Sequence, residues 1–134
     1  MREDKWVISD RRRDPPEATA SEIAFIQGLE ARVDGLQVWF HETAGLPWLI
    51  TSVDIVDHGR IVATPRVDFF GGTIQGALSP TLLNGDDGVS ADHVGVDVDG
   101  PLGLPSRTGS ADELAEVAAS WFSWILATFS LRLE

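Results

Sequence analysis

The 134-residue chain contains no cysteine, which excludes disulfides, thiolate zinc sites and cysteine nucleophiles. This absence fits a reducing compartment, and we expect the protein to be cytoplasmic. Tyrosine is also absent, so the aromatic residues are five tryptophans and six phenylalanines. Of the two longest apolar stretches, 117–131 is shorter than the ~20 residues that span a bilayer, and 69–85 is broken by glycine and proline. The first residues contain no apolar segment of the signal-peptide type. We therefore expect a soluble protein without a signal peptide.

Motifs for catalysis and for metal or nucleotide binding are missing as well. The chain has no GxSxG sequence, and its glycine-rich stretch FFGGTIQG lacks the lysine and the spacing of a phosphate-binding loop. His41, His58 and His93 share no metal-ligand spacing, and NGDDG and DVDG do not supply the oxygen ladder of a calcium loop. These absences predict no metal, no cofactor and no enzymatic activity.

Charge is unevenly distributed along the chain. Residues 1–13 hold five basic and three acidic residues, whereas 14–134 hold five basic and 18 acidic residues, a net charge of −13. Such a chain repels nucleic acid and anionic membranes and attracts basic proteins. The densest acidic segment contains no Lys or Arg between its members, which are Asp86, Asp87, Asp92, Asp97 and Asp99.

Two interpretations of this acidic segment remain open. It is either a solvated loop and strand face or a docking surface for a basic protein. In the second case Trp39 and Trp48, which lie in predicted strands, are candidate aromatic anchors, although both fit the core equally well.

Capping boxes mark the start of two predicted helices. Thr19 with Glu22 begins a helix over about 20–33, which ends at Asp34-Gly35, and Ser110 with Glu113 begins a second over 111–129. The apolar spacing of the second helix places Trp121 and Trp124 in the core.

Alternating residues between the two helices predict strands over 36–41, 48–56, 61–70, 73–78 and 93–98. Asp57-His58-Gly59 predicts a tight hairpin, and Pro65 makes 61–70 an edge strand or marks a bulge. Short strands are also expected at 5–9 and 131–134, a loop at 79–92 and an irregular crossing at 101–109. The predicted fold is α+β, a single antiparallel sheet of five or six strands with an N-terminal and a C-terminal helix packed on it. Residues 1–17 are expected to form a short strand and a charged, proline-containing linker, and 18–134 a single domain.

The order of these elements resembles small α+β immunity proteins of actinobacterial polymorphic-toxin systems, of the type found beside deaminase toxins. The corresponding stretches are LPWLITSVDIVDHGRIVA, FFGGTIQG, VGVDVDGPLGLPSRTGSADELAEVAASWF and SLRLE, although Leu133 stands where the family usually carries a tryptophan. The resemblance implies a cytoplasmic protein that binds a toxin domain and occludes its active site without performing chemistry.

Three functions are compatible with these features. The first is an acidic, non-enzymatic immunity or antitoxin protein that occludes a basic toxin domain, acting as a monomer or a dimer. The second is an acidic secretion chaperone, for which a stable dimer with an apolar interface on helix 111–129 is expected. The third is a small-molecule enzyme with a cup-shaped sheet lined by Trp39, His41, His93 and Asp97.

Overall fold

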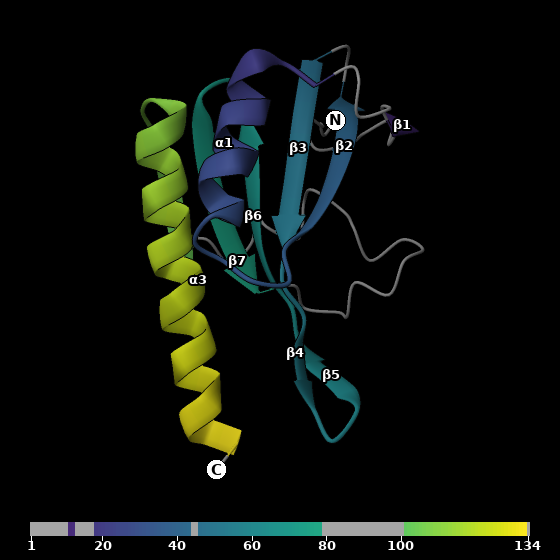
Figure 1. Ribbon diagram of the computed structural model, residues 1–134, viewed down its shortest axis with the longest axis vertical. Coiled ribbons are helices and arrows are strands. Elements are labelled where there is room, and N and C mark those ends of the chain that lie inside the picture. Colours follow the sequence, from purple (N-terminus) through teal and green to yellow (C-terminus); the bar gives the residue numbers. More distant parts are fainter. Residues whose placement is uncertain (1–10, 13–17, 44–45, 79–100, 134) are drawn as a thin grey trace.

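A computed structural model describes residues 11–12, 18–43, 46–78 and 101–133. These residues form a six-stranded antiparallel sheet, a separate two-stranded hairpin and two helices, which confirms the predicted α+β class (Figure 1). The sheet order is β1 (Arg11–Arg12), β2 (Gln37–Thr43), β3 (Leu46–Ser52), β6 (Pro65–Phe70), β7 (Thr73–Leu78) and β8 (Leu104–Thr108). The hairpin pairs β4 (Ile55–Asp57) with β5 (Arg60–Ala63), and the helices are α1 (Ala20–Glu30) and α3 (Ala111–Leu133).

Both helices begin where the capping boxes predict. Thr19 Oγ1 accepts from the Glu22 amide at 3.1 Å, while the Glu22 carboxylate accepts from the Thr19 amide at 2.9 Å. The same reciprocal pair joins Ser110 and Glu113 at the start of α3. The predicted strand at 131–134 is wrong, because α3 continues to Leu133. No glycine or proline follows Phe129 to end the helix.

The two helices lie side by side on one face of the sheet, and a glycine sets their separation. A Cβ atom added to Gly28 of α1 would lie only 2.8 Å from the Ala115 Cβ of α3, closer than two carbon atoms can pack. Their shared core includes Phe25 and Leu29 from α1 and Phe122 from α3, all fully buried. Neither described helix has the length and apolarity that a bilayer-spanning helix requires.

Alternation along the strands divides their side chains between the two faces of the sheet. Leu49 and Val53 join the core beneath the helices, whereas Trp48 and Ile50 form a smaller cluster on the other face. The predicted strand 48–56 is divided into β3 and β4.

The structure corrects the prediction for Pro65. The predicted strand 61–70 breaks at Thr64 into β5 and β6, and β6 lies inside the sheet between β3 and β7 rather than at an edge. Pro65 is the first residue of β6, a position where proline is tolerated within a sheet. Its carbonyl accepts a hydrogen bond from the Val53 amide at 3.1 Å.

The segment 101–109, predicted as an irregular crossing, contains strand β8 at the edge of the sheet. Gly76 of β7 permits this pairing, because a Cβ atom there would lie 2.9 Å from the Arg66 carbonyl oxygen and 3.3 Å from the Leu104 Cβ. At the opposite edge, Arg11 and Arg12 pair with β2, so the charged segment predicted as a linker contributes a two-residue strand. The strands predicted at 5–9 and 93–98 and the loop at 79–92 lie outside the described residues.

The β4–β5 hairpin extends beyond the main sheet (Figure 1). Its turn confirms the prediction from Asp57-His58-Gly59, since His58 and Gly59 have φ angles of 54° and 76°. Positive φ at both central residues matches the right-handed twist of the flanking strands.

Candidate functional site

The seven predicted partner-binding residues divide into two groups. Asp86, Asp87, Asp92, Asp97 and Asp99 lie outside the described residues, so their role stays a prediction. Trp39 on β2 and Trp48 on β3 are described, and the structure brings them together. They belong to one aromatic cluster, on the sheet face that neither helix covers, with Ile50 and Phe70.

Trp48 is held in place by its own chain. Its indole ring stacks on Phe70 with a centroid separation of 4.2 Å, and its N–H donates to Asp68 Oδ2 at 2.9 Å. Only 7% of the residue is exposed, which leaves little surface for a partner. Trp39, on the neighbouring strand opposite Ile50, is half-buried and keeps part of its surface accessible. Of the two predicted anchors, Trp39 is therefore the better placed to contact another molecule.

An ion pair that the sequence reasoning missed supports this cluster. Arg66 and Asp68 are both fully buried, with Nε donating to Oδ1 at 2.7 Å and Nη2 to Oδ2 at 2.8 Å. Two bonds from one guanidinium fix the carboxylate in both position and orientation. The available signal was the sequence PRVDF, in which a base and an acid two residues apart in one strand must share a face.

The same ion pair limits what Asp68 can do chemically. Its two oxygens accept three hydrogen bonds, two from Arg66 and one from Trp48, and the side chain has no contact with solvent. A carboxylate saturated in this way is poorly placed to take a proton from a substrate. The arrangement is that of a structural pair.

Two more polar groups lie beside this pair. Ser52 is opposite Arg66 on β3, and Gln75 is opposite Asp68 on β7. The Ser52 Oγ and the Gln75 Nε2 are buried, and the described part of the chain offers neither a hydrogen-bond partner. This face of the sheet therefore combines an aromatic cluster with an unusually polar interior.

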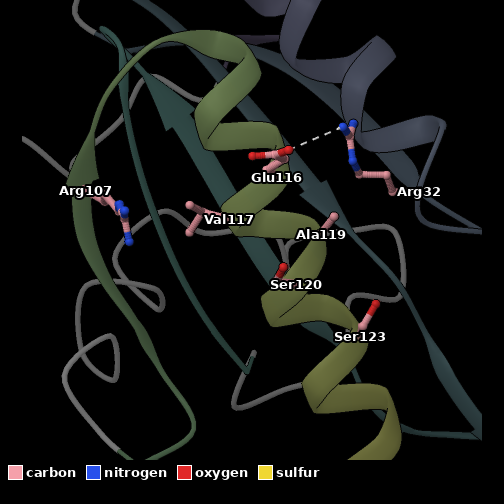
Figure 2. A pocket seen from close by; sticks show the side chains of 7 residues that line it. All are labelled: Arg32, Arg107, Glu116, Val117, Ala119, Ser120 and Ser123. Carbon is pink, nitrogen blue, oxygen red and sulfur yellow. Dashed lines mark ion pairs between the residues drawn. The ribbon is translucent and has the colours of Figure 1, made fainter.

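A second feature is an open groove of about 780 Å³ along the outer side of α3 (Figure 2). Arg32 lies on one side of the helix and Arg107 of β8 on the other, with Ser120 between them. Arg32 Nη1 donates to the Gly28 carbonyl at 2.7 Å, and its Nη2 lies 3.9 Å from Glu116 Oε2. The remaining lining side chains are small or apolar: Val117, Ala119 and Ser123.

The first turn of α3 adds negative charge near this groove. The pKa of the Glu113 carboxyl is lowered mainly by a hydrogen bond with the Ser110 amide and, second, by one with the Ser110 hydroxyl. The positive charge of Arg107 makes a smaller contribution in the same direction. Asp112 and Glu113 are both exposed. The start of α3 therefore presents fixed negative charge at neutral pH.

Only one of the two helix tryptophans is in the core. Trp121 is buried and donates to the Leu102 carbonyl at 3.2 Å, whereas Trp124 is 47% exposed, so its predicted core position is wrong. Three helical positions rotate Trp124 by about 60° relative to Trp121, which carries it past the edge of the buried stripe. Trp124 therefore lies on the outward side of α3, next to the groove residues Ser120 and Ser123 along the helix.

Among the described residues, no histidine forms part of a catalytic or metal site. His58 is a turn residue with an 88% exposed side chain, and its Nδ1 lies 3.1 Å from Asp57 Oδ2. The side chain of His41 and all of His93 and Asp97 lie outside what the structure describes, so the predicted enzyme cup is not tested. Among the described side chains, no group of three His, Asp or Glu residues could hold a metal ion.

Comparison with known proteins identifies no relative. No family model matches the chain, and neither the curated proteins nor the solved structures include a significant match.

Proposed function

We propose that this chain is a cytoplasmic, non-enzymatic inhibitor of the immunity or antitoxin type, which binds a basic toxin domain and occludes its active site. The observation that supports the proposal is the charge of the described surface. Seven acidic residues there are exposed or half-buried, against three exposed arginines. The acids are Glu30, Asp34, Asp54, Asp57, Asp112, Glu113 and Glu116, and the arginines are Arg32, Arg60 and Arg107.

The buried ion pair removes one base and one acid from the surface and leaves the net charge unchanged. Arg66 is one of only five basic residues in 14–134, and its charge is neutralised inside the sheet by Asp68. The rest of that range then holds 17 acids and four basic residues. A surface of this composition accelerates association with a basic protein and disfavours nucleic acid.

The aromatic cluster supplies a candidate for the anchor that electrostatics alone does not provide. Trp39 is partly exposed, and the rings of Trp48 and Phe70 behind it are held by stacking and by Asp68. A rigidly supported, half-exposed tryptophan is a common hot spot of protein interfaces. We place the contact with the toxin around Trp39, together with the acidic segment 86–99.

The proposal predicts that a neighbouring gene encodes a toxin-like domain, and the test uses that domain. Its activity and its association kinetics with the purified chain are measured between about 50 and 500 mM salt. We expect a 1:1 complex, loss of toxin activity, and an association rate that falls at least 10-fold with salt. An association rate independent of salt, or a toxin that stays active in the complex, would contradict the proposal.

Two sets of variants separate the anchor from the charge. Trp39→Ala should raise the Kd about 30-fold with little effect on the association rate, whereas Asp97→Asn with Asp99→Asn should lower mainly that rate. Ile23→Ala, at a 44% exposed apolar residue on α1, is the matched control and should change neither. If Trp39→Ala binds as tightly as the control, the contact lies elsewhere.

A secretion chaperone is the second candidate, and the observation that favours it is the exposed Trp124 on the outer side of α3. The chaperone interpretation predicts a broad apolar dimer interface on this helix. However, Phe122 and Ile125 are fully buried, and the outer side carries mainly serine, alanine and glutamate. The two functions differ in the bound partner, which remains active with a chaperone and is inactive with an inhibitor.

A further inference from the structure

We infer that the groove on α3 binds a second copy of the chain, with the two α3 helices packed antiparallel about a two-fold axis beside Ser120. This inference goes beyond the proposed function. A dimer is compatible with an inhibitor and is also what the chaperone interpretation expects, and the activity of the bound partner distinguishes the two. It rests on the side chains along the outer side of α3. Glu116, Val117, Ser120 and Ser123 line the groove (Figure 2), and Trp124, the residue after Ser123, is 47% exposed.

The spacing of these residues is self-complementary. Val117 and Trp124 are seven residues apart, so they lie along nearly the same line of the helix, two turns apart with Ser120 between them. A two-fold axis beside Ser120 therefore brings Trp124 of each copy over Val117 of the other. This contact is made twice, once in each direction, as an isologous interface requires.

The chemistry of the groove fits an incoming indole. Val117 faces the side of the helix where Arg107 lies (Figure 2), and Arg107 is exposed. A guanidinium beside an apolar floor attracts the face of a tryptophan ring through a cation–π interaction. Because Ser120 and Ser123 are small, the second helix can approach closely enough for Trp124 to reach that position.

The charges of α3 decide between the two helix directions. Asp112, Glu113 and Glu116 all lie in its first two turns, and 117–133 contains no acidic residue. A parallel pair would place these acids against their own copies, whereas an antiparallel pair places them against the acid-free half of the partner helix. The antiparallel direction also opposes the two helix dipoles.

Cysteine cross-linking tests the register, because the chain has no cysteine of its own. Ser120→Cys places one thiol per chain close to the axis, and mild oxidation should convert most of it to a disulfide-linked dimer. Glu116→Cys is displaced from its own copy by about 12 Å along the axis, too far for a disulfide, and should remain monomeric. Equal cross-linking at both positions would indicate a parallel or unspecific contact and overturn the inference.

Sedimentation equilibrium on the full chain tests the dimer itself. The unsubstituted protein should dimerise reversibly, Trp124→Ala should weaken the dimer at least 30-fold, and Ile23→Ala should leave it unchanged. Both substituted residues are large, apolar and about half exposed, so a general loss of surface hydrophobicity would affect them equally. A protein that stays monomeric to millimolar concentration overturns the inference, including the case in which this groove serves the basic partner instead.

Discussion

Replacing Arg66 should destabilise the fold more than almost any other single substitution. Its guanidinium is fully buried, and Arg66→Met leaves the Asp68 carboxylate in the sheet without its two charge-assisted hydrogen bonds. Loss of one partner from a buried ion pair costs about 3–5 kcal/mol, a large part of the 5–15 kcal/mol that stabilises a typical domain. Asp68→Leu should cost a similar amount, because it removes the carboxylate that accepts two hydrogen bonds from the buried guanidinium.

The double substitution distinguishes a coupled pair from two independent residues. Arg66→Met with Asp68→Leu removes both charges of the pair, and Trp48 then loses Asp68 Oδ2 as the acceptor for its indole N–H. That loss costs about 1–3 kcal/mol, well below the 6–10 kcal/mol expected if the two single effects added. The difference is the coupling energy of the pair.

Urea unfolding followed by tryptophan fluorescence measures these free energies. Arg60→Met is the control, because Arg60 is exposed on the β4–β5 hairpin and its loss should change the free energy of unfolding by less than about 0.5 kcal/mol. If Arg66→Met were as mild as the control, or if the double variant showed simple additivity, the buried pair would not hold the sheet as described.

Three other substitutions or titrations test particular contacts. Gly28→Ala should destabilise the protein by about 1–2 kcal/mol despite the better helix propensity of alanine, and adding Ala115→Gly should relieve the 2.8 Å clash; thermal unfolding measures both. The lowered pKa of Glu113 contributes stability that is present above its unfolded-state pKa and is lost as the pH falls through the folded-state value. Glu113→Gln should therefore flatten this part of the curve of unfolding free energy against pH. An unchanged curve would contradict the hydrogen bonds between Glu113 and Ser110. Gly76→Ala should reduce the folded fraction and the amide protection of β8, measured by hydrogen exchange, because its Cβ would meet a backbone carbonyl at 2.9 Å.

Local signals in the sequence predicted much of the fold. The capping boxes at Thr19 and Ser110 define helix starts through hydrogen bonds within four residues, so no tertiary information is needed. The turn at His58-Gly59 and the alternation on either side of Trp48 are equally local. The structure therefore confirms the predictions made from these features.

Errors arose where tertiary pairing decides the outcome. Proline is usually confined to sheet edges, yet Pro65 begins an interior strand because its missing N–H falls at the strand's first residue. The irregular composition of 101–109 concealed β8, which forms because Gly76 leaves space for it. Neither pairing can be seen without its partner strand.

The candidate site shows the same limit. Composition predicted a charged surface and aromatic anchors, but the sequence could not show that Trp48 bonds to Asp68 or that Trp124 faces outward. Trp121 and Trp124 were equivalent in the sequence, and only their burial in the structure distinguishes them. The ion pair of Arg66 and Asp68 was missed because charged residues in a strand are expected to face solvent.

The most direct test is the association of this chain with the toxin-like domain that a neighbouring gene is predicted to encode. Stopped-flow fluorescence follows the association while the activity of that domain is assayed. An acidic inhibitor should form a 1:1 complex per chain, with an association rate that falls at least 10-fold between about 50 and 500 mM salt and a toxin that is inactive once bound. An association rate insensitive to salt, or full toxin activity in the saturated complex, would contradict the claim that this is an acidic inhibitor.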